Sequence, residues 1–134
     1  MPWQAILDES NRVVTVNNWE HPVGIPCAPD TPMGYEWTGT EFVRPISDIT
    51  QELLAAVQQH LDATVRTRGY DSMLSCCSYV SSTDPTFSAE ALDAAAWRDA
   101  VWRYCYDAQD DYTAGTRPVP TPDELIAELP ALVW

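Results

Sequence analysis

The sequence predicts an α+β fold, in which a small β-rich module of residues 1–45 precedes a helical domain of residues 46–134. Short runs of β-forming residues, separated by turn residues, occupy the first 45 positions. After Pro45, apolar residues recur at helical spacing. The 134 residues are 46% hydrophobic, so the chain is large and apolar enough for one compact domain with at most a small subdomain.

The first predicted hairpin joins residues 3–7 to residues 12–16. Both runs are rich in β-forming residues, and the segment between them at 8–11, Asp-Glu-Ser-Asn, has the composition of a turn. A four-residue connection of this kind is common between antiparallel strands.

A second hairpin is predicted for residues 35–37 and 41–43, which flank Gly39. Glycine readily adopts the positive φ that such a tight loop often needs. Between the two hairpins, residues 22–32 contain four prolines, and proline has no N–H to donate to a strand ladder. We therefore expect an extended loop over residues 22–32 and a module of three or four strands.

A long helix is predicted over residues 48–68. Asp48 suits the N-cap position, with Gln51 three residues later as in a capping box. Gly69 suits the left-handed position that follows many helices. The apolar stripe that would face the core comprises Ile49, Leu53, Leu54, Ala56, Val57, Leu61 and Val65.

A second long helix is predicted over residues 89–112, with Ser88 as its N-cap and Gly115 beyond its end. Its apolar arc of roughly 200° is wider than one core contact requires. Core packing against the first helix accounts for most of this face, and the surplus width indicates a docking surface. The face comprises Trp97, Val101, Tyr104, Cys105, Ala108 and Tyr112, with Trp102 and Tyr106 at its edge.

Seven residues are therefore candidates for binding a partner protein, because aromatic side chains are enriched among interface anchors. Four lie in the second long helix and three in the second hairpin: Trp97, Val101, Trp102, Tyr106, Tyr35, Trp37 and Phe42.

One or two short helices complete the helical domain. Asp71 could cap a helix that carries Met73, Leu74, Cys77 and Val80, although serine and cysteine dilute the pattern. Residues 81–85 are predicted to be a loop. Thr121 at the N-cap and Pro122 at the first helical position predict a last short helix, which Pro130 stops.

The charge of the chain argues against two classes of partner. Twenty acidic residues face seven arginines and no lysine, a formal charge of −13. Nucleic-acid and anionic membrane surfaces attract cations, so we expect no binding to nucleic acid and none to membranes. No apolar run approaches the roughly 20 residues that span a bilayer, and we expect no secretory signal at the N-terminus. An acidic intracellular domain is the resulting expectation.

The cysteines and histidines do not form a recognisable metal or catalytic motif. Zinc sites use ligand pairs two to four residues apart, whereas Cys76 and Cys77 are adjacent. We expect Cys27, Cys76, Cys77 and Cys105 to be small buried hydrophobes. His60 falls on the apolar face of the first long helix, where a core residue bonded to a neighbour is the better interpretation.

We also expect His21 and the Asp110-Asp111 pair to be solvated side chains, because no third ligand follows at a useful spacing. The expectation is therefore no catalytic site, no metal and no cofactor.

Residues 33–45 are Met-Gly-Tyr-Glu-Trp-Thr-Gly-Thr-Glu-Phe-Val-Arg-Pro. This segment is similar to the element G-W-x-Y-D-G-x-x-F-x-x-P, with Thr38 in place of the usual Asp. The element belongs to a family of small bacteriophage tail proteins, the tail fibre assembly chaperones or tail assembly proteins, which this chain therefore resembles. Residues 60–72, 96–102 and 122–130 resemble the helical part of such proteins.

The resemblance implies a non-enzymatic chaperone or tail accessory protein that docks on the C-terminal region of a tail fibre or on another tail protein. It would act in the host cytoplasm during assembly. Alternatively, it is a permanent adaptor or cap in the virion tail. The sequence leaves homo-oligomerisation open. A third reading, an acidic inhibitor that mimics nucleic acid, depends only on the charge of −13, and the acids are spread along the chain.

Overall fold

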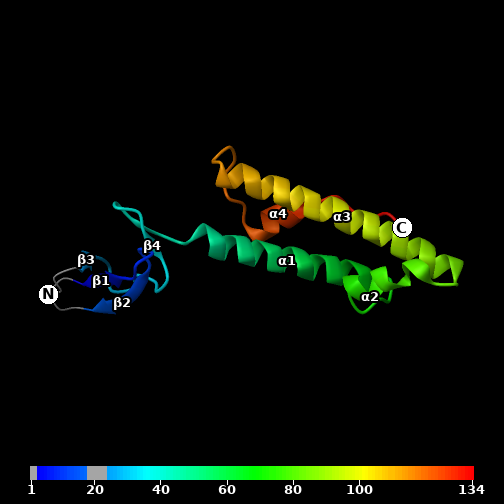
Figure 1. Ribbon diagram of the computed structural model, residues 1–134, viewed down its shortest axis with the longest axis horizontal. Coiled ribbons are helices and arrows are strands. Elements are labelled where there is room, and N and C mark those ends of the chain that lie inside the picture. The colour runs from blue at the N-terminus through cyan, green and yellow to red at the C-terminus, as the bar shows by residue number, and fades with distance from the viewer. Residues whose placement is uncertain (1–2, 18–23) are drawn as a thin grey trace. The chain divides into compact units, whose positions relative to one another are not determined.

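The computed structural model describes residues 3–17 and 24–134 and confirms the α+β arrangement (Figure 1). A small N-terminal sheet region is followed by four helices, two of them long. The chain divides into two compact units, Met1–Ile49 and Thr50–Trp134, which are described separately below. The predicted division at residue 45 lies four residues before the observed one.

The first unit contains the predicted first hairpin. Strands β1 (Gln4–Leu7) and β2 (Val13–Asn17) pair antiparallel. In the turn, the Asp8 carboxylate accepts hydrogen bonds from the backbone N–H groups of Ser10 and Arg12, at 2.8 and 3.0 Å. Asn11 adopts the left-handed conformation at φ 60°, which asparagine tolerates better than most residues.

The expectation of an extended loop over residues 22–32 is wrong at β3 (Ile25–Pro26), which pairs antiparallel with β1 in the sheet order β2-β1-β3. The Cys27 N–H extends this pairing by donating to the Trp3 carbonyl at 3.0 Å. Proline is tolerated here because β3 is at the end of the described sheet order, where one side of the strand needs no donor. Residues 22 and 23 lie outside the described residues.

The second predicted hairpin is also present, as β4 (Glu36–Trp37) and β5 (Phe42–Val43). Gly39 between them has φ 97°, as the tight loop requires. The Trp37 and Phe42 rings pack with centroids 4.7 Å apart. Backbone hydrogen bonds connect this hairpin to the first, from the Val13 N–H to the Tyr35 carbonyl and from the Trp37 N–H to the Asn11 carbonyl, both at 2.8 Å.

Two long antiparallel helices form the second unit, α1 (Ile46–Arg66) and α3 (Pro85–Thr113) (Figure 1). Thr50 near the start of α1 bonds Tyr112 near the end of α3 at 2.6 Å, which fixes their direction. Both helices bury one face, and this supplies most of the stabilising apolar burial. The core comprises Leu53, Val57, Leu61, Val65, Met73, Cys76, Ala91, Ala94, Trp97, Val101, Cys105, Ala108, Tyr112 and Leu125.

Both long helices begin earlier than predicted. Asp48 is not the N-cap of α1 but lies in its first turn, and the Pro45 carbonyl accepts the first hydrogen bonds, from Asp48 and Ile49. In α3 the N-cap is Asp84, not Ser88. The Asp84 carboxylate accepts from the N–H groups of Thr86 and Phe87 at 2.9 and 3.2 Å. A proline, Pro45 or Pro85, fixes φ where each helix begins, and this favours an earlier start than the predicted caps Asp48 and Ser88 would give.

The short helices are α2 (Met73–Ser78), which continues into a 3₁₀ turn at Tyr79–Ser81, and α4 (Pro122–Glu128). Ser72 caps α2, so the expectation of Asp71 at that position is wrong, and Leu74 is 82% exposed. α1 ends two residues before its predicted end and α3 one residue after it, and Gly69 and Gly115 follow with the expected positive φ values of 96° and 78°.

Candidate functional site

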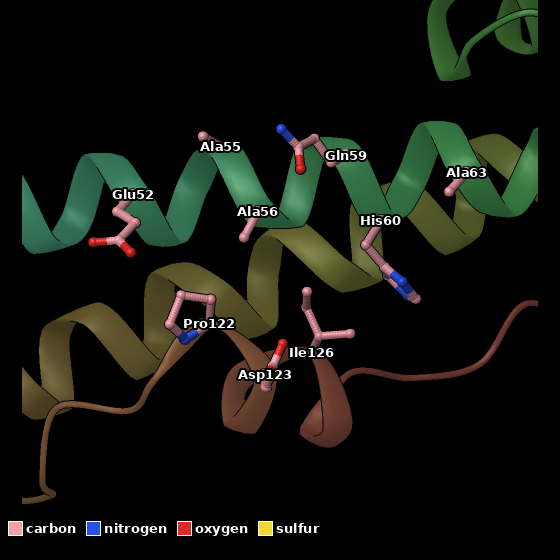
Figure 2. A pocket seen from close by; sticks show the side chains of 9 residues that line it. All are labelled: Glu52, Ala55, Ala56, Gln59, His60, Ala63, Pro122, Asp123 and Ile126. Carbon is pink, nitrogen blue, oxygen red and sulfur yellow. The ribbon is translucent and has the colours of Figure 1, made fainter.

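A groove with a volume of about 580 Å³ lies between α1 and α4 in the second unit (Figure 2). Ala56 and His60 point from α1 toward α4, which supplies Pro122 and Ile126 on the opposite side. The residues that line the groove are Glu52, Ala55, Ala56, Gln59, His60, Ala63, Pro122, Asp123 and Ile126.

The wall formed by α4 is held by specific contacts with α3 and its C-terminal connection. The Tyr104 hydroxyl donates to Glu128 at 2.8 Å, and Arg117 pairs with the same carboxylate at 3.0 Å. The hydrogen bond from Arg117 is the main cause that lowers the pKa of Glu128. Beyond α4, the Trp97 indole N–H donates to the Pro130 carbonyl at 2.7 Å. These contacts fix the wall of the groove.

The start of α4 is also ordered by its own sequence. The Thr121 hydroxyl accepts from the Glu124 N–H at 3.2 Å, and the Glu124 carboxylate accepts from the Thr121 N–H at 3.1 Å. This is the reciprocal capping box that the Thr-Pro-Asp-Glu order favours. Leu125 is buried, so α4 is anchored on one face while Ile126 remains at the groove.

His60 is not a core residue, contrary to the sequence interpretation. Its side chain is half-buried and lines the groove, and its ring meets Trp97 edge-on, with centroids 5.9 Å apart and planes at 65°. The buried stripe of α1 is narrower than the sequence suggested, because it comprises only Leu53, Val57, Leu61 and Val65. His60 therefore lies beside the core and not within it.

The groove can accept an apolar segment of another chain. Three alanines, a proline and an isoleucine line it, and small side chains allow another backbone to approach closely. The charged lining residues are Glu52 and Asp123, both acidic. A complementary segment would therefore combine apolar residues with a basic one.

Two of the predicted partner-binding residues of α3 are in the core. Trp97 is 6% exposed and Val101 is fully buried, so neither can anchor a partner on this unit. Trp102 is half-buried and Tyr106 is 54% exposed, with ring centroids 6.3 Å apart. Together with Asp99 and Arg103 they line a shallow cavity of about 300 Å³. The wide apolar arc thus divides into a buried face and an exposed edge.

Tyr104, which was predicted to lie on the same apolar face of this helix, is half-buried at the Glu128 contact. In the first unit, Tyr35, Trp37 and Phe42 are all half-buried around the β4–β5 hairpin.

The cysteines divide into two groups. Cys76 and Cys105 are buried, and burial raises the pKa of each thiol to about 11, which keeps both protonated at neutral pH. Cys27 and Cys77 are half-buried, so the expectation of four buried cysteines is wrong for these two. Cys77 differs because its sulfur accepts a hydrogen bond from Arg98 at 3.4 Å, near the surface.

Within residues 3–17 and 24–134, no three His, Cys, Asp or Glu side chains gather in a way that could hold a metal ion. Asp110 and Asp111 are exposed at the end of α3, and His21 lies outside the described residues.

The lining of the groove was not predicted from the sequence. Ala55, Ala56 and Ala63 lie beside the apolar stripe of α1, which is a weak signal for a small-residue surface. That Ile126 and Pro122 face them depends on where α4 packs, for which the sequence carries no signal.

In the part of the chain that the structure describes, no helix is long and apolar enough to cross a membrane. No protein-family model, no curated protein and no solved structure matches this chain.

Proposed function

We propose that this protein is a non-enzymatic bacteriophage tail fibre assembly chaperone or tail accessory protein that docks on the C-terminal region of the fibre. The observation that carries the proposal is the open α1–α4 groove, lined mostly by small and apolar side chains. Five of its nine lining residues lie in segments 60–72 and 122–130, which are among those that resemble the family: His60, Ala63, Pro122, Asp123 and Ile126.

Docking alone is sufficient for such a function. Before assembly, fibres expose strand edges and apolar seams between subunits, and these surfaces promote aggregation. A protein that binds only the unassembled form shifts the equilibrium away from aggregation by mass action, without chemistry. The groove supplies apolar surface for this purpose, and the Trp102–Tyr106 edge is a second candidate contact.

The charge of the helical unit is consistent with a transient role. Residues 50–134 carry thirteen acidic and five basic side chains, a net charge of −8. Copies of the unit therefore repel each other, which keeps an exposed apolar groove from driving self-association. The same field favours a partner segment with basic residues.

The test is co-expression of the fibre protein with this chain and its groove variants. Ala55→Arg and Ala63→Arg place a long cation at exposed helix positions in the groove, so they should reduce the yield of soluble fibre without unfolding the chaperone. Ala100→Arg, at an exposed position of α3 that does not line the groove, is the matched control and should leave the yield unchanged. If all three variants gave the same yield of soluble fibre as the wild type, docking through this groove would be refuted.

Quantitative mass spectrometry of purified particles distinguishes the two forms of the proposal. Absence from virions, with capture of the fibre protein from lysate, identifies a departing chaperone. A fixed integer ratio to a tail protein identifies a permanent component.

A further inference from the structure

Another pocket lies where α1 ends and α3 begins, next to the 3₁₀ turn that follows α2. It has a volume of about 300 Å³, at the small end of the range for ligand sites, which is about 300–1,000 Å³. The pocket is lined by Arg68, Gly69, Tyr70, Tyr79, Phe87 and Glu90. None of these residues lines the α1–α4 groove.

Three aromatic rings form the walls of this pocket. Tyr79 stands between the other two, with ring centroids 5.5 Å from Tyr70 and 5.8 Å from Phe87. The planes meet at 64° and 73°, so Tyr79 packs edge to face with both neighbouring rings. Tyr79 is 39% and Phe87 45% exposed, and large apolar side chains that remain exposed around a cavity indicate a binding site.

A carboxylate, that of Glu90, also lines the pocket. The Glu90 side chain is only 15% exposed, and it accepts hydrogen bonds from the Tyr70 hydroxyl at 2.8 Å and from Arg68 Nε at 3.0 Å. An aromatic box with a carboxylate is an arrangement that attracts organic cations, because each ring presents a negative face.

The cluster already receives one cation from the chain itself. The Arg68 guanidinium lies over the Trp134 ring, 5.2 Å from its centroid, and Trp134 in turn stacks on Tyr70 at 6.4 Å. Arg68 is 47% exposed, so this guanidinium is held at the rim of the pocket. The contact shows that the Trp134 ring beside the pocket already packs its face against a planar cation.

We propose that the Tyr70–Tyr79–Phe87 pocket receives an arginine side chain of a partner protein. The ring faces recognise the planar guanidinium, and the net charge of −8 on the unit favours a basic partner. The inference rests on the proposed function only in taking the partner to be a protein. It adds to that function a further contact, independent of the groove, and the chemistry of the residue that occupies it.

The experiment is a ¹H–¹⁵N NMR titration of the full chain with Nα-acetyl-arginine methylamide, beside the neutral isostere Nα-acetyl-citrulline methylamide. Salt at ~150 mM screens non-specific attraction to the acidic surface. We expect saturable shifts at Gly69, Tyr79 and Phe87, with the arginine derivative bound about fivefold more tightly than citrulline.

Three variants sharpen the result. Phe87→Leu keeps an apolar side chain but removes a ring, so it should abolish the preference for arginine. Arg68→Gln removes the cation that competes for Glu90, and should strengthen arginine binding several-fold. Leu74→Ala removes an exposed apolar side chain of α2 outside the pocket, and this variant should bind as the wild type does.

Equal binding of citrulline, an unchanged preference in Phe87→Leu, or shifts that map away from the pocket would each overturn the inference. If the groove variants leave the yield of soluble fibre unchanged and the chain still binds arginine, only the proposed docking on the fibre is refuted.

Discussion

At the scale of single residues, the most informative side chain is Glu90. Hydrogen bonds from the Tyr70 hydroxyl, first, and from Arg68 lower the pKa of Glu90 below its ordinary value. For Tyr70, burial and then the bond to Glu90 raise the pKa to about 12, so its hydroxyl remains a donor at neutral pH. Nothing in the sequence connects residues 70 and 90, because the pair forms only where α1 and α3 are brought together.

The pKa of Glu90 predicts a pH dependence of stability. Because the folded value lies below the unfolded value of about 4.3, the contribution of Glu90 is fully present above that pH and is lost as the pH falls through the folded pKa. Glu90→Gln should therefore lower the free energy of unfolding at neutral pH, and this difference from wild type should shrink in acid.

Urea unfolding between about pH 3 and pH 7 measures the effect. Asp93→Asn is the control, because Asp93 is exposed and lies about one turn after Glu90 in α3. This variant should not show the pH-dependent loss of stability. A wild-type advantage over Glu90→Gln that is constant with pH would contradict the assignment.

At the scale of elements, helix ends were the most predictable features, and helix starts were less so. The ends of α1 and α3 lie within two residues of their predicted positions, because Gly69 and Gly115 readily adopt the left-handed conformation that follows many helices. The starts at Ile46 and Pro85 were misplaced, since several neighbouring residues can act as caps and proline decided between them. The edge strand β3 was missed because its stability comes from pairing with β1.

The cap of α4 was predicted and its loss can be measured. Thr121→Ala removes the hydroxyl that accepts from the Glu124 N–H, which should cost about 1 kcal/mol of stability. Because α4 forms one wall of the groove, the same variant should also weaken docking in the co-expression assay.

Chemical denaturation of Thr121→Ala measures the first effect. Thr83→Ala, at an exposed loop position before α3, is the matched control and should change stability by less than about 0.5 kcal/mol. Equal stability of the two variants would show that the capping box contributes little.

At the scale of the whole molecule, the dominant property is the charge of −13. Repulsion among the acidic side chains opposes compaction and is screened by salt. Part of this negative charge lies at the C-terminal end of α3, where Asp110 and Asp111 are near the negative end of the helix dipole and no basic residue is in the last turn.

Raising the concentration of sodium chloride should therefore raise the thermal midpoint of unfolding. Asp110→Asn combined with Asp111→Asn should stabilise the protein by about 1 kcal/mol at low salt, or about 4 °C, and should reduce its response to salt. Circular dichroism melts at low and high salt test both statements. A double variant that melts at or below the wild-type temperature at low salt would contradict them.

The sequence by itself determined the class of fold, both hairpins, the two long helices and the glycine-terminated ends. These features depend on local backbone preferences and on the period of apolar residues, which are written in consecutive positions. The tertiary structure alone decided which side chains of the wide α3 face are buried, and it moved Trp97 and Val101 into the core.

Both candidate binding sites were likewise decided by packing. The groove joins Ala56 and His60 to Ile126, and the aromatic pocket joins Tyr70 to Phe87 and Glu90. Each combines residues distant in sequence, because a surface recess is formed by the way helices pack on one another, and side-chain type along a single helix does not specify its neighbour.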